Sequence, residues 1–378
     1  MDNKQITFQL IEAAFKGDKV KFESEDEKGL LKLLFENGLI GLVFNSVDKA
    51  SFKDQNLYKR MREIHASFIA KDIQQTEIIN QIKHAFNEAK IDHIFLKGAH
   101  LKSMYPMSYM RGMGDIDLLV RERDFEDAKN MMQRLGYIFK SAESHHHVYE
   151  TLDGNSIELH QSLASYLEPE FKSLLQQAWD FIIQGDSFTK QLEPEFEYLH
   201  LLIHLVRHIR TSGVGIRSVL DLEVFAKYQT LETEKLFNLL SLTSLIEFND
   251  KVNHLNQIFM HSIHMNESDQ EVVDYIIHAG IHGNGTEHDR YLTKRTYQKT
   301  KQKKGRIRYL LGEIFPSRDR LKEGYPYLKK HSWLLPWAWF VRILKQLFKP
   351  KNTIKRIESV SSDKNMDKVE RIYTYLGL

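Results

Sequence analysis

Two aspartates one residue apart stand at the start of an apolar run, and they restrict what this part of the chain can form. Asp115 and Asp117 alternate with aliphatic residues in a run that ends at Val120. Alternate side chains of a β-strand point to opposite faces, so both carboxylates are expected on one face, with Ile116 and Leu118 in a core. At about 3.3 Å per residue, the two carboxylates lie roughly 7 Å apart along the strand. The pattern therefore predicts a strand whose paired acids can share divalent metal ions, of which Mg²⁺ suits such oxygen ligands.

A third acid and a glycine turn are predicted beside this pair. Glu158 stands between two aliphatic residues in a second predicted strand, residues 156–160. Upstream, a strand over 91–96 leads into a helix that begins at Lys97 and Gly98. A helix N-terminus presents free N–H groups and the positive end of the helix dipole, which favour a phosphate group. The sequence therefore predicts metal-binding acids close to a phosphate-binding turn.

The rest of the chain is predicted to be mainly helical. Residues 58–89 contain no proline or glycine and carry apolar residues at three- and four-residue spacing, which predicts one long amphipathic helix or two. A further helix is expected from Asp124 to Leu135, capped by Asp124 and ended by Gly136. We therefore expect an α+β fold, in which a small mixed β-sheet core with helices is flanked by N- and C-terminal helical regions. Four regions are expected: an N-terminal helical region (1–90), an α/β core (91–165), a helical domain (166–292), and a basic linker with a Trp-rich amphipathic C-terminal region (293–378).

Composition and charge exclude several classes of protein. The 378 residues suffice for two or three compact units, and 42% hydrophobic with 28% charged residues is typical of a soluble globular protein. The formal net charge is +2, so nucleic-acid binding would need a local basic surface. The chain has no cysteine, which excludes disulfides and zinc–thiolate sites and is compatible with a reducing cytosol. Without a secretory signal or an uncharged apolar stretch of about 20 residues, a cytoplasmic protein is expected.

Four segments between about residues 91 and 163 together carry a family resemblance. They are Leu96–Leu101, Tyr105–Pro106, Arg111–Val120 and Ile157–His160. In this combination they resemble the DNA polymerase β-like nucleotidyltransferase superfamily, whose signature is a glycine turn, a short helix, an acid–hydrophobic–acid strand and a third acid on a later strand. Within it they are similar to a poorly characterised bacterial branch with a Lys-Gly turn.

The resemblance implies Mg²⁺-dependent transfer of an NMP from an NTP to a hydroxyl or similar acceptor, with release of pyrophosphate. It implies that Asp115, Asp117 and Glu158 are catalytic and hold two Mg²⁺ ions. The nucleotide-binding residues that it implies are Lys97, Gly98, Ala99, Arg111 and Gly114. The acceptor stays open between a small molecule, a protein and RNA.

One of these positions departs from the superfamily pattern, and another allows two roles. Ala99 stands where the superfamily turn usually has a serine or glycine, so a phosphate-binding hydroxyl is missing. The point charge of Lys97 can compensate for it. Arg111, four residues before Asp115, either reaches a triphosphate or locks the loop that leads into the strand.

Two alternative functions remain open at this stage. The first is a non-catalytic nucleotide-sensing or scaffolding module, which the missing turn serine favours and the three retained acids oppose. The second is an RNA-modifying, toxin-type nucleotidyltransferase, which requires the basic run at 294–308 to face the acids. Such a run either grips a polyanion or forms a solvated linker.

Several histidines are candidates for the wall of the same cleft. His200, His204 and His208 follow i, i+4, i+8 spacing and share one helix face, where they either line the cleft or pack half-buried against a neighbour. His160 shares a strand face with Glu158 and is expected at the site. The three histidines at 145–147 are interpreted as part of a solvated hairpin, with a loop near the site as the alternative.

The C-terminal region carries a further candidate contact surface. Residues 331–349 contain three of the four tryptophans, next to arginine and lysine. Such a segment suits a helix lying flat at a membrane interface, or one docked on the body of the protein or on a partner. We therefore expect a peripheral membrane or partner contact through this segment, since so apolar a helix is not expected to stay free in water.

Overall fold

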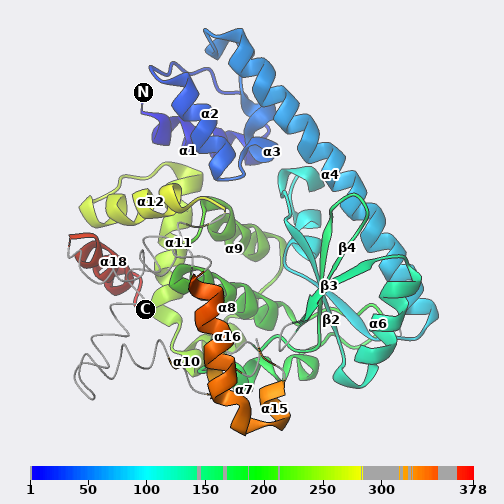
Figure 1. Cartoon of the computed structure of the whole chain (residues 1–378). Helices are drawn as coiled ribbons and strands as arrows, with labels where there is room; N and C mark the ends of the chain where they lie inside the picture. The colour runs from blue at the N-terminus through cyan, green and yellow to red at the C-terminus, as the bar shows by residue number, and fades with distance from the viewer. Residues whose placement is uncertain are drawn as a thin grey trace. The chain divides into compact units, whose positions relative to one another are not determined.

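The computed structural model describes most of the chain and divides it into two compact units. The described residues are 2–142, 146–164, 168–185, 187–211, 213–281, 283, 315, 318–321, 325, 327–347 and 364–378. The first unit comprises residues 1–209, 213–283 and 375–378, and the second comprises 210–212 and 284–374. Figure 1 shows the elements of each. The four-region division expected from the sequence is finer than these two units and stays a prediction.

The first unit begins with short helices and one long helix. Their bounds are α1 (Asn3–Lys16), α2 (Glu27–Glu36), α3 (Ile40–Val43), 3₁₀ turns at Phe44–Ser46 and Lys49–Ser51, and α4 (Gln55–Glu88). The side chain of Asp54 accepts a hydrogen bond from the backbone N–H of Asn56, which fixes the start of α4. Because no proline or glycine interrupts it, α4 is one continuous helix, and this decides between the one or two helices that the sequence allows (Figure 1).

A mixed five-stranded sheet follows, as expected. Its strands are β1 (His93–Leu96), β2 (Asp115–Val120), β3 (Ile138–Ala142), β4 (His146–Glu150) and β5 (Ser156–His160). Their order is β1-β2-β5-β4-β3, in which β2 and β5 are parallel and all other neighbours are antiparallel. In the parallel pair, Asp117 stands directly beside Glu158. The central position of β2 and β5 therefore brings together the two acidic segments that the sequence singled out.

Short helical elements connect the strands. They are α5 (Gly98–Leu101), 3₁₀ turns at Lys102–Met104, Ser108–Met110 and Glu122–Asp124, and α6 (Phe125–Arg134). Asp124 stands at the N-cap position of α6, as expected, but among the described residues its side chain makes no capping hydrogen bond. Asp124 is the last residue of a 3₁₀ turn, with φ −98° and ψ 2°, and not in the extended conformation typical of an N-cap residue whose side chain reaches the next N–H groups. Gly136 lies just beyond the helix at a φ of 82°, as a helix-ending glycine should.

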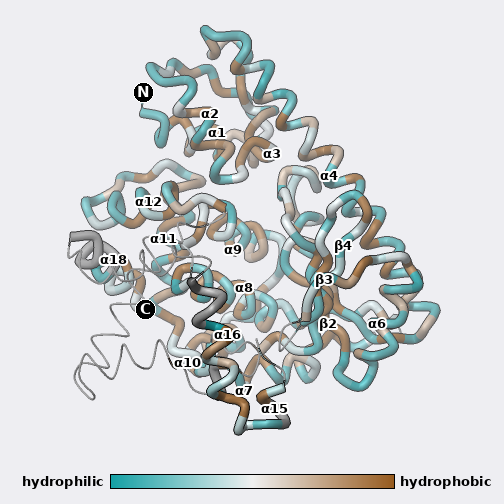
Figure 2. The backbone as a smooth tube through the Cα atoms, in the orientation of Figure 1, coloured by the Kyte–Doolittle hydropathy of each residue, from teal (hydrophilic) through white to brown (hydrophobic). Residues whose placement is uncertain are grey.

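One face of the sheet packs against α4 and α6. The core there contains Ile116 and Leu118 of β2, Ile82 of α4 and Met132 of α6, all fully buried. Each such side chain contributes roughly 1.5–3 kcal/mol when it leaves water. Strand alternation then turns the odd-numbered residues of β2 to the opposite face. Figure 2 shows the hydrophobic strands at the centre and hydrophilic positions along much of α4.

A helical region completes the first unit. Its elements are α7 (Lys172–Leu175), a 3₁₀ turn at Ala178–Asp180, α8 (Pro194–Thr211), α9 (Ile216–Tyr228), α10 (Thr233–Thr243), α11 (Ile246–His261) and α12 (Glu267–Ala279). Helix α8 is buried along most of its length, including its polar residues Glu195, Glu197 and His200. Glu197 pairs with His100 of α5, next to the sheet, whereas Glu195 accepts from the backbone N–H of Glu232 and pairs with Lys235 of α10.

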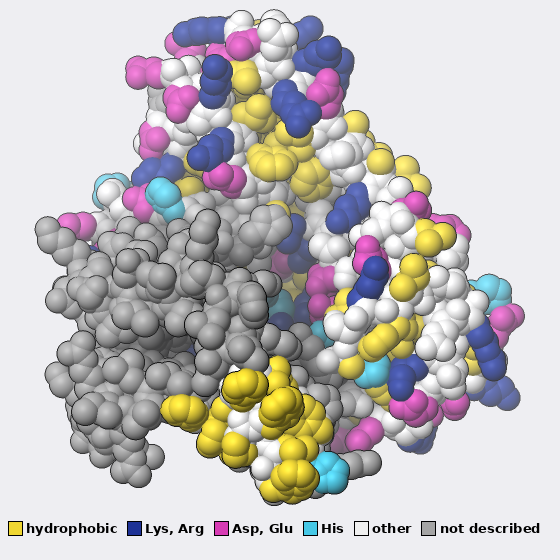
Figure 3. Space-filling view, in the orientation of Figure 1, with side chains coloured by type: hydrophobic (Ala, Val, Ile, Leu, Met, Phe, Trp, Pro, Cys, Tyr) yellow, Lys and Arg dark blue, Asp and Glu magenta, His cyan; other side chains and the backbone are white. Residues whose placement is uncertain are grey.

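The second unit contains the tryptophan-rich segment. Its described elements are α14 (Arg318–Leu321), α15 (Tyr327–Lys330), a 3₁₀ turn at Ser332–Leu334, α16 (Leu335–Leu347) and α18 (Lys364–Tyr375), whose last residue belongs to the first unit. Ala338 packs with Leu321 and Leu328, whereas Trp333 and Trp337 are exposed. Figure 3 shows hydrophobic side chains gathered over α15 and the adjoining end of α16. Contact of this surface with a membrane or partner stays a prediction.

Two further expectations from the sequence concern the basic run and the absence of a membrane-spanning helix. The basic run at 294–308 lies outside the described residues. No helix within the described ranges combines the length and the apolar character that crossing a bilayer requires.

Candidate functional site

Three carboxylates converge at the centre of the sheet, on the face opposite α4 and α6. Asp115 and Asp117 come from β2 and Glu158 from β5, and one carboxylate oxygen of each lies within 4.8 Å of the others. Asp117 is buried, with 3% of its surface exposed, and the other two are half-buried. The structure thus brings together the three acids that the sequence predicted as metal ligands. Their oxygen donors fit the preference of Mg²⁺.

Lys97 reaches this cluster from a strained turn. It lies between β1 and α5 with φ 48° and ψ −124°, a conformation that residues other than glycine rarely adopt. Its Nζ donates a hydrogen bond of 2.7 Å to Oδ1 of Asp117. Strained backbone of this kind costs on the order of 1–3 kcal/mol and persists where the surrounding structure holds it. Here the strained turn directs the ammonium group onto the acids.

The glycine turn is closely packed rather than open. A Cβ built on Gly98 would lie 2.8 Å from Cγ of Met113 and 3.1 Å from Nη1 of Arg111, so only glycine fits. Ala99 packs against the core between the sheet and helices. Helix α5 has four residues, so its dipole is small, and the charge of Lys97 has to supply most of any attraction for phosphate. Gly114, in contrast, has no described atom within 4 Å of an added Cβ.

Arg111 is held by Asp221, a buried acid that no local feature of the sequence connects with it. Its Nε and Nη2 donate to the two carboxylate oxygens of Asp221 on α9, at 3.0 and 2.6 Å. The hydroxyl of Tyr105 donates to the same carboxylate at 2.8 Å. Arg111 and Arg217 both donate to the carbonyl of Gly112, at 2.9 and 2.7 Å. These contacts match the loop-locking role expected for Arg111, and a role in binding triphosphate stays a prediction.

The electrostatics of the three acids are uneven. Burial and the neighbouring charge of Asp117 raise the pKa of Asp115 to about 6. Burial alone would raise the pKa of Asp117, but Lys97 and His160 outweigh it and hold that pKa well below its ordinary value. For Glu158, burial would raise the pKa, but the hydrogen bond and charge of His160 together with the charge of Lys97 outweigh it, so the pKa is lowered. A raised pKa beside two ionised neighbours indicates surplus negative charge, which a divalent cation would relieve.

His160 and His146 stand next to the acids. Nε2 of His160 lies 3.0 Å from Oδ1 of Asp117 and 3.3 Å from Oε2 of Glu158, and it donates to them when protonated. Nε2 of His146 lies 3.9 Å from Oε1 of Glu158. The prediction of a solvated hairpin at 145–147 is wrong for His146, which is buried in β4 because it pairs with His160 of β5. His145 lies outside the described residues.

The three histidines of α8 are buried or half-buried and favour their neutral forms. Burial, followed by the charge of Lys97, lowers the pKa of His200 to about 3. Burial also lowers the pKa of His208 to about 4 and holds that of His204 well below its ordinary value. His204 and His208 share a hydrogen bond of 2.8 Å between their Nε2 atoms. Since Lys97 acts on all three, this helix face lies within electrostatic range of the acids, and its role as a cleft wall stays a prediction.

The structure shows one contact between α5 and α8 that the sequence does not predict. Nδ1 of His100 lies 2.6 Å from Oε1 of Glu197, whose side chain is buried. Burial would lower the pKa of His100, but the hydrogen bond and the charge of Glu197 outweigh it, so that pKa is raised. The two residues lie far apart in sequence, so their pairing could be found only from the fold.

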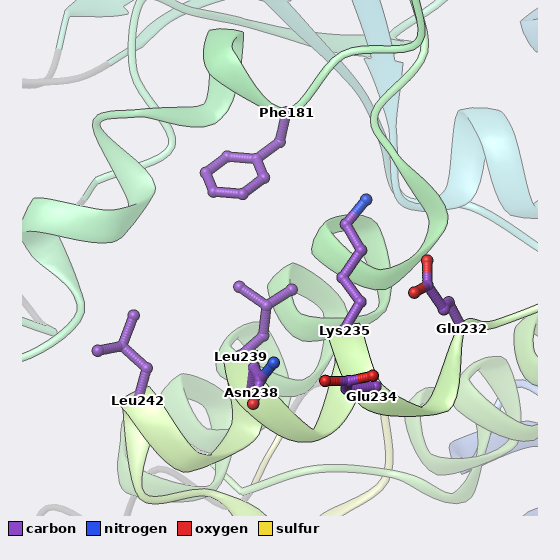
Figure 4. A pocket seen from close by; sticks show the side chains of 7 residues that line it. All are labelled: Phe181, Glu232, Glu234, Lys235, Asn238, Leu239 and Leu242. Atoms are coloured by element: carbon purple, nitrogen blue, oxygen red, sulfur yellow. The ribbon is translucent and has the colours of Figure 1, made fainter.

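A separate pocket in the first unit involves other residues. Phe181, Lys235 and Leu242 are among its lining residues, all labelled in Figure 4, and within the described part of the chain it includes none of the predicted site residues. In the space-filling view, acidic, basic and histidine side chains are visible together in a recess next to the sheet instead (Figure 3).

Comparison with known proteins gives one family. The model of a family described as "Uncharacterised nucleotidyltransferase" matches residues 23–261, which is more than half of the chain. The match includes the turn at Lys97, the three acids and helix α8. Neither a curated protein nor a solved structure matches the chain.

Proposed function

The chain belongs to the family of uncharacterised nucleotidyltransferases, and on that premise we propose that it moves an NMP from an NTP to an acceptor hydroxyl with the help of Mg²⁺. The observation that carries the proposal is the convergence of Asp115, Asp117 and Glu158 within 4.8 Å, beside the ammonium group of Lys97. In the reaction, the acceptor oxygen bonds to the α-phosphorus and the bond from that phosphorus to the β-phosphate bridging oxygen breaks. Pyrophosphate leaves, and the hydroxyl proton passes to a base.

The residues fit a pair of divalent ions. Asp115, Asp117 and Glu158 would hold two Mg²⁺ ions, which lower the pKa of an acceptor hydroxyl and neutralise the phosphates. In the structure Lys97 supplies a positive charge to Asp117 at 2.7 Å. When a nucleotide is bound, the flexible stem of Lys97 lets the same ammonium group turn to a phosphate oxygen as a point charge.

The acids differ in how strongly they can accept the hydroxyl proton. Glu158 has a lowered pKa because His160 donates to it, so its carboxylate is a weak base. Asp115, with a pKa raised to about 6, is a stronger base before any cation binds. General bases work best when their pKa lies near the operating pH. Because Glu158 is a weak base, lowering the pKa of the acceptor hydroxyl is the chemistry that Mg²⁺ held by the three acids would supply.

A labelling experiment tests this function and identifies the acceptor class. Purified protein is incubated with Mg²⁺, each α-³²P-labelled NTP in turn, and a lysate of its source organism. Label that reaches a metabolite, a protein or an RNA is expected with the wild type and with an Asp153→Asn control, whose exposed carboxylate lies in the β4–β5 turn. It is not expected with an Asp115→Ala/Asp117→Ala double variant.

Other outcomes would contradict the proposal. Mg²⁺-dependent NTP binding by the wild type without any transfer would instead support a nucleotide-sensing module. Neither transfer nor binding would leave the family fold without the activity proposed for it.

A further inference from the structure

A second cluster of metal-ligating side chains shares one acid with the carboxylate site. His146 of β4 and His160 of β5 are direct partners in the antiparallel register, and their ring centroids lie 5.0 Å apart. Glu158 precedes His160 by two residues on the same strand, so both side chains point to the same face of the sheet. One ligand atom from each of the three lies within 4.8 Å of the others.

The ligand types suit a metal ion that is softer than Mg²⁺, and the distances are compatible with one such ion. Nε2 of His160 lies 3.3 Å and Nε2 of His146 lies 3.9 Å from separate oxygens of Glu158. Ligand atoms bonded to one transition metal at about 2.0–2.2 Å stand about 3–3.5 Å apart. The ligand atoms of the three residues, all within 4.8 Å of one another, therefore have to draw closer to bind a single ion.

We propose that His146, Glu158 and His160 bind a divalent first-row transition-metal ion, next to the Mg²⁺ site and with Glu158 shared between them. Two imidazoles and a carboxylate suit such ions, whereas Mg²⁺ takes oxygen ligands almost exclusively. His146 and His160 are 7% and 6% exposed, so the packed sheet holds both rings before any ion arrives. The inference rests on the proposed function, because it places Glu158 between this ion and the Mg²⁺ site.

The charges around the cluster favour an added cation. Asp115, Asp117 and Glu158 contribute three carboxylates, which pair with Lys97 and, when it is protonated, with His160. Arg111 and Arg217 also interact with Asp115, but both lie beside the carboxylate of Asp221. An ion on the imidazoles would replace the proton on Nε2 of His160 and keep a positive charge beside Glu158. Asp117 would still have its hydrogen bond from Lys97.

Co²⁺ is the probe of choice, because its visible absorption reports its ligands without any catalysis. The full chain is titrated with Co²⁺ in a large excess of Mg²⁺ and without nucleotide. We expect one tightly bound Co²⁺ in the wild type and at least about tenfold weaker binding by His146→Gln. The matched control is His147→Gln, since His147 points to the other face, against Phe125 and Phe139, and its loss should leave Co²⁺ binding unchanged.

Two further measurements keep the test decisive. Proton NMR of the Co²⁺-loaded wild type should show two strongly shifted imidazole N–H signals, a result that does not depend on how well a variant folds. Asp115→Asn should still bind Co²⁺ while losing nucleotidyl transfer, so failure of the transferase proposal and failure of this one give different results. Displacement of Co²⁺ from the wild type by Mg²⁺, equal binding by His146→Gln, or absence of shifted imidazole signals would overturn the inference.

Discussion

At the residue scale, Lys97 combines a useful charge with an unfavourable backbone. Its ammonium group stabilises Asp117, while its positive φ of 48° strains the turn. The two effects can be separated, because alanine and glycine both remove the charge and glycine alone removes the strain.

We predict that Lys97→Gly is more stable than Lys97→Ala by about 1 kcal/mol, because alanine keeps the Cβ that disfavours this conformation. Urea unfolding of both variants measures the difference in their free energies of unfolding. Equal stability of the two variants would show that the turn relaxes to an ordinary conformation once the lysine is gone.

A second residue-scale prediction concerns pH. His100 has a raised pKa because Glu197 stabilises its protonated form, so its contribution to stability is fully present below its ordinary pKa and is lost as pH rises through the raised value. The destabilisation caused by His100→Gln should therefore shrink as pH rises above about 6.5, the ordinary pKa of histidine. Denaturation curves of both proteins across that range would test it, and a constant difference would contradict the assigned partner.

At the scale of elements, the loop before β2 is attached to α9 by a buried ion pair. Arg111 and Asp221 form two hydrogen bonds, and their side chains are 9% and 6% exposed. Removal of one partner leaves the other charge buried and uncompensated, which typically costs about 3–5 kcal/mol.

We predict that Arg111→Met and Asp221→Leu each destabilise the protein strongly, and that the double variant loses less than the sum of the two. The coupling should be on the order of 1–3 kcal/mol, since the residues are in direct contact. A double-mutant cycle in chemical denaturation measures it. Additive effects would show that the pair does not hold the loop.

The strands of the site could be predicted because their signals are local. The alternation around Asp115 and Asp117 has a period of two, which helices do not share, and Glu158 repeats it in a second short apolar run. The same holds for the helical character of α4, although the sequence left one helix or two open and the structure shows one. The expected mixed sheet in an α+β fold is confirmed for this reason.

The remaining parts of the site depend on pairing between distant segments. Asp221 has no local feature that connects it to Arg111, and His146 becomes buried only when β4 pairs with β5. Strand register is set by the turn and by the buried face together, and a shift of one residue would exchange His146 with His147. The sequence therefore indicates which residue types are available but not which of the three neighbouring histidines faces the acids.

At the scale of the whole molecule, cation binding should stabilise the fold. A ligand that binds the native state alone raises its stability by RT ln(1 + [L]/Kd). We predict that Mg²⁺ raises the melting temperature of the wild type and that this effect weakens below about pH 6, where Asp115 takes up a proton. An Asp115→Asn/Asp117→Asn variant should show no Mg²⁺ effect in the same thermal scan, and an unchanged effect would place the ion elsewhere.

The central claim is that the three-acid site transfers the nucleotidyl group and not the terminal phosphate. The most direct measurement uses one NTP labelled with ³²P at the α-phosphate and ³³P at the γ-phosphate, together with Mg²⁺ and the lysate. The account predicts that ³²P stays with the acceptor and ³³P appears in pyrophosphate, with a rate at least about a hundredfold lower for Asp117→Asn. Transfer of ³³P to the acceptor, or an Asp117→Asn rate equal to that of the wild type, would contradict it.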